Sequence, residues 1–417
     1  LVGYTGRVSG QESVTITQCY EWARANYPQI HQMGLIDQTE RYSLSNVGKA
    51  WLPQLSVSGK ASYQSDVTKL PFDGDKISSL LPGFEIPSLS KDQYQVVAQV
   101  DQTIWDGGSA RSARALTRAE ATANREQLES ELYALNDRVN QLYFGCLLQD
   151  ELIRQNALLQ KELQVNIERI EAMMENGVAN QSDLESMEVE LLNARQNEIE
   201  LKASRTVYRQ MLATFINKPL TDQVVLKTPE SPERSLSTQI NRPELRALDA
   251  KSEWIETQNK QVTAGLMPRI GAFVQGGYGR PGLNMLEDSF EPYYVAGVRL
   301  SWNLGKLYTL KNDRRKIEVS RRQIDVQRET FLFNTRLQLL RQNTEIKKMT
   351  DLMRADDDII RLRTSIKQAA EVKLENGVIS VTDLIREINA EDMARQTAAA
   401  HRVQRLMTIY NYMYTTN

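Results

Sequence analysis

The most regular feature of this chain is a repeat of apolar positions in steps of three and four residues. Such a repeat is typical of long amphipathic helices that pack side by side as coiled coils. In the first half it comprises Leu128, Leu132, Leu135, Val139, Leu142 and Cys146, and then Leu184, Met187, Leu191, Ala194, Leu201, Tyr208, Leu212 and Phe215. In the second half it comprises Val319, Val326, Phe333, Leu340, Ile359, Leu362, Ile366 and Ala370.

The ranges 108–175 and 306–375 contain no proline, and each predicts one long helix. At about 1.5 Å per residue, each helix would be roughly 100 Å long. Shorter helices are expected over 13–46 and 180–216. Helices of this length favour an elongated coiled-coil architecture over an ordinary globular core.

Four other segments alternate between apolar and polar residues with a period of two: 53–64, 93–105, 268–279 and 292–305. This pattern, with aromatic residues near the segment ends, is typical of membrane-spanning β-strands. The apolar face would carry Val57, Ala61, Val96, Ala98, Val298 and Leu300, which we expect to face lipid. The half-buried hairpins of a soluble protein are an equally good interpretation of these segments alone.

The elements follow the order helix, strand, strand, long helix, turn and helix, and the same order is then repeated. The chain is therefore interpreted as an internal duplication. We expect an N-terminal tail (1–12), a first repeat (13–216), a connector (217–240) and a second repeat (241–417). The connector is expected because it is rich in proline and interrupts the helical periodicity.

A short polar phrase marks the same place in both repeats: ENGVANQSDL (175–184) returns as ENGVISVTDL (375–384). Gly177 and Gly377 follow long helical segments, where a left-handed residue is needed to end a helix. Asn180 and Ser380 each precede an aspartate, Asp183 or Asp383, by three residues, which is the spacing of a capping box. Both phrases thus predict a tight turn between two antiparallel helices. A catalytic role for these aspartates is disfavoured, because no nucleophile or base accompanies them.

Composition points away from several functional classes. The 51 basic and 53 acidic residues give a net charge of −2, so nucleic acid is not an expected partner. The two histidines and two cysteines are scattered, and Cys146 falls on an apolar stripe. We therefore expect no catalytic residues, no cofactor-binding residues and no metal site, and the protein is not expected to be an enzyme. No run of about 18 apolar residues predicts a transmembrane helix.

Together these motifs resemble the TolC-like outer-membrane efflux proteins. The resemblance runs from about residue 13 to the end. It rests on the paired ENGV…DL turns, the strand entries LPQLSVSG and MPRIGAF, the strand exits WDGG and WNLG, and the sequence NRPEL at 241–245.

The resemblance implies a mainly α-helical chain with membrane β-strands, assembled as a homotrimer. Three chains would form one 12-stranded β-barrel in the outer membrane of a Gram-negative bacterium, continuous with a periplasmic α-helical barrel. It further implies an exit channel of a tripartite efflux or type I secretion system. The partners would be a periplasmic adaptor protein, an inner-membrane pump and outer-membrane lipid.

The resemblance also places the two turns at the periplasmic tip, where the channel narrows. The candidate tip residues are Gly177, Val178, Asp183, Leu184, Glu185, Gly377, Val378, Asp383, Leu384 and Arg386. An acidic position of the family falls on Arg386 here, so a simple ring of acids is not expected. We hypothesise instead that Arg386 bridges to Asp183 or Glu185 on a neighbouring hairpin and holds the tip closed.

A soluble periplasmic coiled-coil adaptor or scaffold remains the alternative interpretation. It would share the long helices but would have no need of four strands with a lipid-facing pattern. In the channel interpretation, 66–92 and 280–291 are the outward-facing loops.

Overall fold

The computed structural model describes residues 13–68, 89–231, 239–285 and 287–417. The chain divides into two compact units, and each unit draws on both predicted repeats. Leu1–Gly34, Asn124–Leu248 and Val326–Asn417 form the first, here called the helical unit. Leu35–Ala123 and Asp249–Asp325 form the second, here called the sheet unit.

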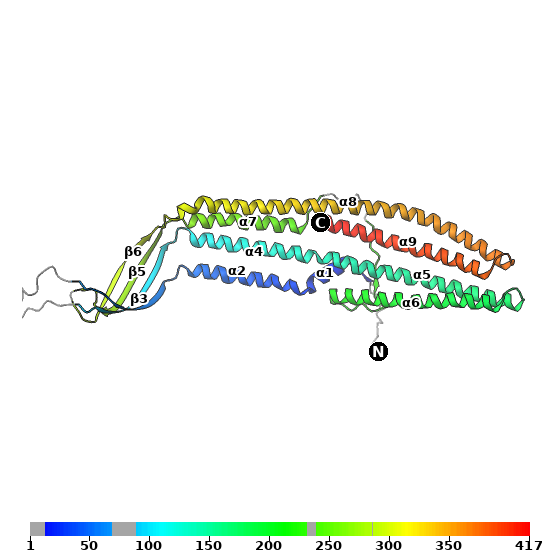
Figure 1. Ribbon diagram of the computed structural model, residues 1–417, viewed down its shortest axis with the longest axis horizontal. Coiled ribbons are helices and arrows are strands. Elements are labelled where there is room, and N and C mark those ends of the chain that lie inside the picture. The colour runs from blue at the N-terminus through cyan, green and yellow to red at the C-terminus, as the bar shows by residue number, and fades with distance from the viewer. Residues whose placement is uncertain (1–12, 69–88, 232–238, 286) are drawn as a thin grey trace, which may run out of the picture. The chain divides into compact units, whose positions relative to one another are not determined.

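Long helices build the helical unit. They include α1 (Ile16–Asn26), α5 (Leu135–Glu175), α6 (Gln181–Ile216), α9 (Val381–Thr416) and the C-terminal parts of α4 (Ser109–Tyr133) and α8 (Lys306–Glu375). Helices α8, α9, α5 and α6 lie side by side in that order (Figure 1). The predicted helices 180–216 and 306–375 are therefore confirmed.

The two remaining helix predictions need correction. The range 13–46 contains strand β1 (Ser13–Val14), α1, the 3₁₀ helix η1 (Pro28–His31) and the start of α2 (Gln32–Lys49). Pro28 lies at the start of η1, because a proline lacks the N–H that a helix interior requires. The range 108–175 is divided at Ala134 into α4 (Ser109–Tyr133) and α5.

The apolar repeat of the first half forms the core of the helical unit. All six residues of the repeat on α4 and α5 are buried, with exposed fractions between 0% and 7%. Strand β1 pairs with β4 (Val225–Leu226) of the connector, and the buried Tyr143 hydroxyl shares its one hydrogen between the Val14 and Lys227 carbonyl oxygens, at O···O distances of 2.9 and 2.7 Å. Residues 225–227 of the connector are thus fixed to the core, which the periodicity alone did not predict.

The apolar repeat of the second half behaves differently. Val319, Val326, Phe333 and Leu340 on α8 are 55–64% exposed, and Ile359, Leu362 and Ile366 are about half exposed. Only Ala370 of this set is buried. Within one chain these residues of α8 therefore form no buried seam, and their coiled-coil packing stays a prediction. These residues form an apolar stripe that has no partner among the described residues.

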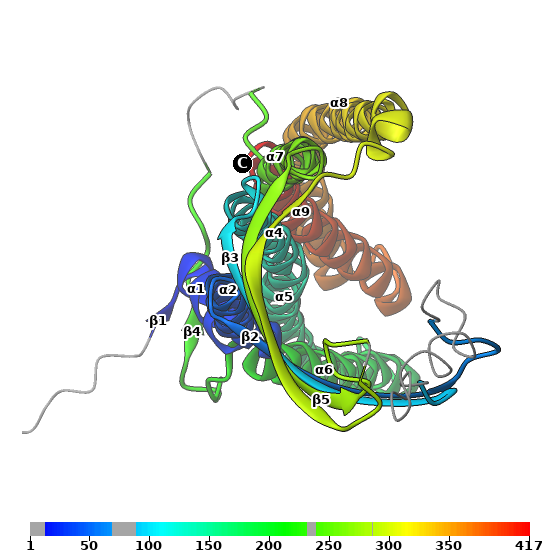
Figure 2. The same cartoon turned by 90° about the vertical axis from the view of Figure 1, so that its left-hand side faces the viewer.

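The sheet unit contains the four predicted strands: β2 (Gln54–Tyr63), β3 (Asp92–Trp105), β5 (Arg269–Arg280) and β6 (Glu291–Ser301). They form one antiparallel sheet in the order β2-β3-β5-β6, and the sheet is strongly curved (Figure 2). The pairing of β3 with β5 joins the two repeats. Helices α2, α4, α7 (Pro243–Ala264) and α8 connect to one end of these strands.

The pairing register places most of the exposed apolar residues of the four strands on one face. Val57 is opposite Ala98, Val96 is opposite Tyr278, and Ala272 is opposite Val298. All six residues predicted for the apolar face are on it and are exposed: Val57, Ala61, Val96, Ala98, Val298 and Leu300. The opposite face carries Ser56, Ser58, Lys60, Gln95, Gln99, Gln275 and Arg299.

Strands β2 and β6 are the edges of this sheet, which is open among the described residues. The predicted barrel is therefore not contained in one chain. Of the predicted outer loops, 281–285 and 287–290 have no regular structure, whereas 69–88 lie outside the described residues. None of the described helices is long and apolar enough to span a membrane.

Close packing of α5 against α6 gives the first prediction. A Cβ atom added at Gly145 would lie 2.6 Å from Cε1 of Tyr208, whereas one added at Gly34 has no atom within 4 Å. Gly145→Ala should therefore lower the free energy of unfolding by about 1–3 kcal/mol through overpacking. Gly34→Ala, the control, should raise it by about 0.5–1 kcal/mol. Thermal unfolding of the purified proteins measures both, and equal effects would contradict the close contact.

Candidate functional site: the hairpin tips

Each tip is a tight turn between two antiparallel helices, as predicted. Gly177 and Gly377 have φ angles of 71° and 68°, in the left-handed region that favours glycine. At the first tip the amides of Gly177 and Val178 donate to Met174 and Met173 carbonyls at 2.9 and 2.8 Å. The second tip repeats these bonds from Gly377 and Val378 to Leu374 and Lys373. At each turn these two hydrogen bonds provide partners for carbonyl groups in the last turn of the preceding helix, α5 or α8.

The two aspartates are helix caps. Asn180 accepts from the Asp183 amide at 3.1 Å, and the Asp183 carboxylate accepts from the Asn180 amide at 3.1 Å. Ser380 and Asp383 repeat this reciprocal arrangement. A hydrogen bond from the Ser380 hydroxyl is the main cause that lowers the pKa of Asp383. The capping boxes predicted from the sequence are confirmed, so the repeated phrase is explained by local structure.

The charges at the tip are exposed and held mostly by their own helix. Arg386 lies 3.4 Å from Asp383 and 3.4 Å from Glu387, and its side chain is 70% exposed. Glu185 accepts from Gln181 at 3.1 Å. The described contacts of Arg386 are thus within α9. The expected bridge to Asp183 or Glu185 of a neighbouring hairpin involves another copy of the chain and stays a prediction.

The apolar tip residues divide into two groups. Leu384 is completely buried, and Leu184 packs against the same cluster of α5, α6, α8 and α9 side chains. Val178 and Val378 are 57% and 69% exposed. The leucines therefore hold each hairpin together, and the valines are available to another surface.

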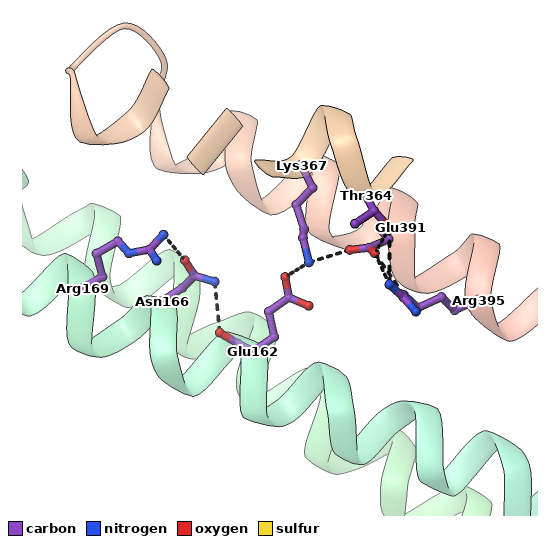
Figure 3. Close-up of polar contacts among 7 residues, drawn as sticks. All are labelled: Glu162, Asn166, Arg169, Thr364, Lys367, Glu391 and Arg395. Carbon is purple, nitrogen blue, oxygen red and sulfur yellow. Dashed lines mark hydrogen bonds and ion pairs between the residues drawn. The ribbon is translucent and has the colours of Figure 1, made fainter. Parts of the chain in front are cut away.

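An ionic network between the two hairpins was not predicted. Lys367 of α8 forms ion pairs with Glu162 of α5 and, at 2.6 Å, with Glu391 of α9 (Figure 3). Glu391 also accepts from Thr364 at 2.5 Å and from Arg395 at 3.0 and 2.5 Å. The side chains of Lys367 and Glu391 are only 12% and 2% exposed.

Burial and hydrogen bonding oppose each other in this network. Burial lowers the pKa of Lys367, but its bonds to Glu162 and Glu391 outweigh burial and leave the pKa raised. Burial raises the pKa of Glu391, but the donors around it outweigh burial and leave the pKa lowered. Both groups are therefore charged in the folded protein. Removing one partner of a buried ion pair costs about 3–5 kcal/mol, because the other charge is left without compensation.

Two further contacts connect the hairpins. Arg169 of α5 lies 3.7 Å from Glu375 of α8, and Asn389 of α9 donates to Glu190 of α6 at 3.4 Å. A signal for the network exists in the sequence. Glu391 continues the spacing of the buried Leu384 and Ile388, where an apolar residue is expected. A charged residue in a coiled-coil seam indicates a specific polar partner.

No metal-binding arrangement accompanies these elements among the described residues. No group of three His, Cys, Asp or Glu side chains there could hold a metal ion. His401 Nδ1 lies 2.7 Å from Asp356, a pairing that the sequence context did not indicate. Cys19 and Cys146 are both completely buried, and burial raises the pKa of each thiol to about 12. Cys146 is therefore a core residue, as predicted.

Comparison with known proteins agrees with this geometry. Residues 19–218 match the model of the outer membrane efflux protein family. No curated protein sequence matches the chain.

Among solved structures, the fold is similar to CusC, which is described as forming a transmembrane channel. The TM-score is 0.68 at 13% identity, over 96% of this chain and 92% of CusC. The outer-membrane channel OprN gives a TM-score of 0.68 at 14% identity, over 96% and 89% of the two chains. VceC, an outer membrane protein of Vibrio cholerae, gives 0.64 at 12%, over 95% of each chain. The resemblance to TolC-like outer-membrane efflux proteins is thus confirmed by a family model and by the fold.

Asp392, next to the network, gives a prediction for pH. Burial is the main cause that raises its pKa to about 6, above the ordinary value of about 4. The folded state therefore binds more protons than the unfolded state between these values, and the contribution of Asp392 to stability is lost as the pH rises through 6. Asp392→Asn should raise the melting temperature at pH 7.5 and have little effect near pH 4.

Thermal unfolding at the two pH values measures this difference. Asp357→Asn, which changes an exposed acid on α8, is the matched control and should have little effect at either pH. An Asp392→Asn protein that is less stable than wild type at pH 7.5 would contradict the assignment.

Proposed function

We propose that this chain forms a homotrimeric exit channel in the outer membrane, as part of a tripartite efflux or secretion system. The observation that carries the proposal is the exposed apolar face shared by all four strands. A soluble coiled-coil adaptor would have to leave this face in water, whereas a lipid bilayer would cover it.

Aromatic residues bound the apolar face at both ends. The end connected to the helices carries the exposed residues Trp51, Trp105 and Trp302. The other end carries one exposed tyrosine from each strand: Tyr63, Tyr94, Tyr278 and Tyr294. Tyr94 and Trp105 are 11 positions apart, which is about 36 Å along a strand at about 3.3 Å per residue. At a tilt of about 45°, this distance spans roughly 25 Å of bilayer, the height of an outer-membrane apolar band.

Closure of the sheet requires other copies of the chain. An open sheet edge leaves backbone N–H and C=O groups unpaired, which lipid does not tolerate. Pairing of β6 of one copy with β2 of the next would close the sheet by rotational symmetry. Three copies of the four-stranded sheet give the 12 strands implied by the family resemblance.

The helical unit supports the same assembly. Its two outer helices each carry an exposed apolar stripe: Val189, Leu192, Ile199, Val207 and Met211 on α6, and Val326, Phe333, Leu340, Ile359, Leu362 and Ile366 on α8. These helices lie at opposite edges of the four-helix layer (Figure 1). In a ring of copies, the α8 edge of one chain meets the α6 edge of the next, so both stripes become buried.

In this proposal the hairpin tips form the periplasmic entrance. A periplasmic adaptor and an inner-membrane pump would deliver the substrate there, and the chain itself would act as a passive duct and not as an enzyme. The buried network around Lys367 keeps the two hairpins of one chain together. Exposed contacts at Val178, Val378 and Arg386 would then hold neighbouring hairpins closed, and a docking partner would open them.

Conductance in planar lipid bilayers tests the proposal. Wild-type protein should insert and form channels of low conductance. Arg386→Glu should raise the conductance, because it replaces an attractive contact between hairpins with a repulsive one. Each such exposed ion pair contributes only about 0–1 kcal/mol, so the change is expected to shift the gate without unfolding it.

Arg354→Glu is the matched control, because Arg354 also pairs with an aspartate three residues earlier, at 3.1 Å, and is 78% exposed. It lies away from the tip and should leave the conductance unchanged. Failure of the wild type to insert or conduct would exclude the channel. Unchanged conductance in Arg386→Glu would instead mean that packing at Val178, Leu184, Val378 and Leu384 closes the tip.

A further inference from the structure

We propose that the first turns of α4 and α8 carry a phospholipid-binding surface, which holds the anionic headgroups of the leaflet nearest the helices. Its basic residues are Arg111, Arg114 and Arg118 on α4, and Lys311, Arg314 and Arg315 on α8. The inference rests on the proposed function, since it assumes that the apolar face of the sheet lies in a bilayer.

The surface begins where the apolar face of the sheet ends. On β6 the apolar face continues from Val298 and Leu300 to Trp302, and every residue from 301 to 309 is exposed. This stretch includes Leu304 and Leu307, both 53% exposed, and Tyr308, which is 90% exposed. Exposed apolar and aromatic side chains at a helix start are costly in water and are typical of a membrane interface.

Basic residues follow within three helical turns. Lys311 and Arg314 lie four and seven positions after Leu307, so the three residues share one face of α8. Seven residues of helix rise about 10 Å, which is comparable to the headgroup layer beside the hydrocarbon core. The order of apolar, aromatic and basic residues therefore matches the order of hydrocarbon, interface and phosphate.

The same arrangement occurs in the first repeat. Arg114 and Arg118 lie 9 and 13 positions after Trp105, and Lys311 and Arg315 lie 9 and 13 positions after Trp302. Trp105 is the last residue of β3 and Trp302 directly follows the last residue of β6, and each strand leads directly into a helix. The spacing is thus present at both strand exits, although the rest of the two helix sequences differs.

Ionic partners for these residues are absent from the described ion pairs. Further along α8, Arg321 and Arg322 are paired with Glu256 and Glu318 at 3.0 and 2.6 Å, whereas no described ion pair involves the six basic residues of the surface. Residues 109–118 contain no acid, and residues 306–318 contain five basic and two acidic residues. The local excess of positive charge contrasts with the net charge of −2 for the whole chain.

A pocket beside Arg111 offers space for part of a lipid, such as its headgroup or one segment of an acyl chain. It lies between α4 and α7, has a volume of about 470 Å³, and is lined by Arg111, Lys260, Met267 and small residues that include Ala115 and Ala264. Its lining contains two cations and no carboxylate. Phosphate can contact the cations while an acyl chain covers the apolar wall, so the charge and shape of the pocket favour an anionic phospholipid.

Native mass spectrometry of the assembled full chain tests the surface. The protein in detergent is titrated with phosphatidylglycerol, or with phosphatidylcholine that has the same acyl chains. We expect tighter binding of phosphatidylglycerol. Each basic residue near a membrane surface contributes about a fivefold gain in affinity. Lys311→Gln/Arg314→Gln and Arg111→Gln/Arg114→Gln should therefore each weaken phosphatidylglycerol binding at least fivefold and leave phosphatidylcholine binding unchanged.

Arg341→Gln/Lys347→Gln is the matched control, since both residues are exposed on α8 and neither forms a described ion pair. It should not change lipid binding. Equal binding of the two lipids, or unchanged affinity in both surface variants, would overturn the inference. A loss of assembly mass in the surface variants would show that a second copy, and not lipid, covers these residues, and would overturn it too.

Bilayer conductance separates this outcome from failure of the proposed function. If wild-type protein conducts and the surface variants bind phosphatidylglycerol as tightly as wild type, the proposed lipid surface is wrong but the proposed channel is not. If wild-type protein neither inserts nor conducts, the proposed function itself is wrong.

Discussion

The unpaired edges of a four-stranded sheet are the constraint on which the rest of this structure depends. Backbone N–H and C=O groups along the outer sides of β2 and β6 have no strand partner within the described chain. At the same time, one face of the sheet carries most of its exposed apolar side chains. Water would leave the apolar face uncovered, and lipid would leave the edges unsatisfied. An assembly in which the edges pair with other copies would satisfy both requirements, which is the physical reason for the oligomer and the membrane in the proposed function.

The helical unit also exposes groups that other copies of the chain would cover, and here these groups are apolar side chains instead of backbone N–H and C=O groups. The apolar side chains at heptad positions of α5 are buried inside the chain, whereas those at equally regular positions of α8 remain exposed. Polar contacts around Lys367 and Glu391 add specificity where α5, α8 and α9 meet. A buried charge accepts few alternative partners, so this network fixes how the two hairpins of one chain pack. The exposed tip residues take no part in that network, which suits the contacts that open and close in the proposed function.

Much of the fold was predictable because two periods dominate the sequence. The period of two predicted the strands and the residues of their apolar face. The glycines that end a helix, together with the capping boxes, predicted both tips. The periodicity could not show which apolar stripes pack within one chain, because exposed stripes on α8 and buried stripes on α5 have the same spacing. The pairing of β1 with β4 and the bridge from Lys367 to Glu162 were missed for a different reason. They join residues about 200 positions apart, and no local pattern encodes such a contact.

Cysteine cross-linking between the two edge stripes tests the central claim, which is closure by identical copies, most directly. Leu192 on α6 and Leu362 on α8 are 59% and 54% exposed, and each lies 15 positions from the glycine of its turn. Both native cysteines are buried, so the double variant Leu192→Cys/Leu362→Cys adds the reactive thiols. Oxidation of that variant should give covalent species of up to three chains, and neither single variant should do so. Monomers alone, with each chain unlinked or closed on itself, would contradict closure of the α6 and α8 edges by other copies.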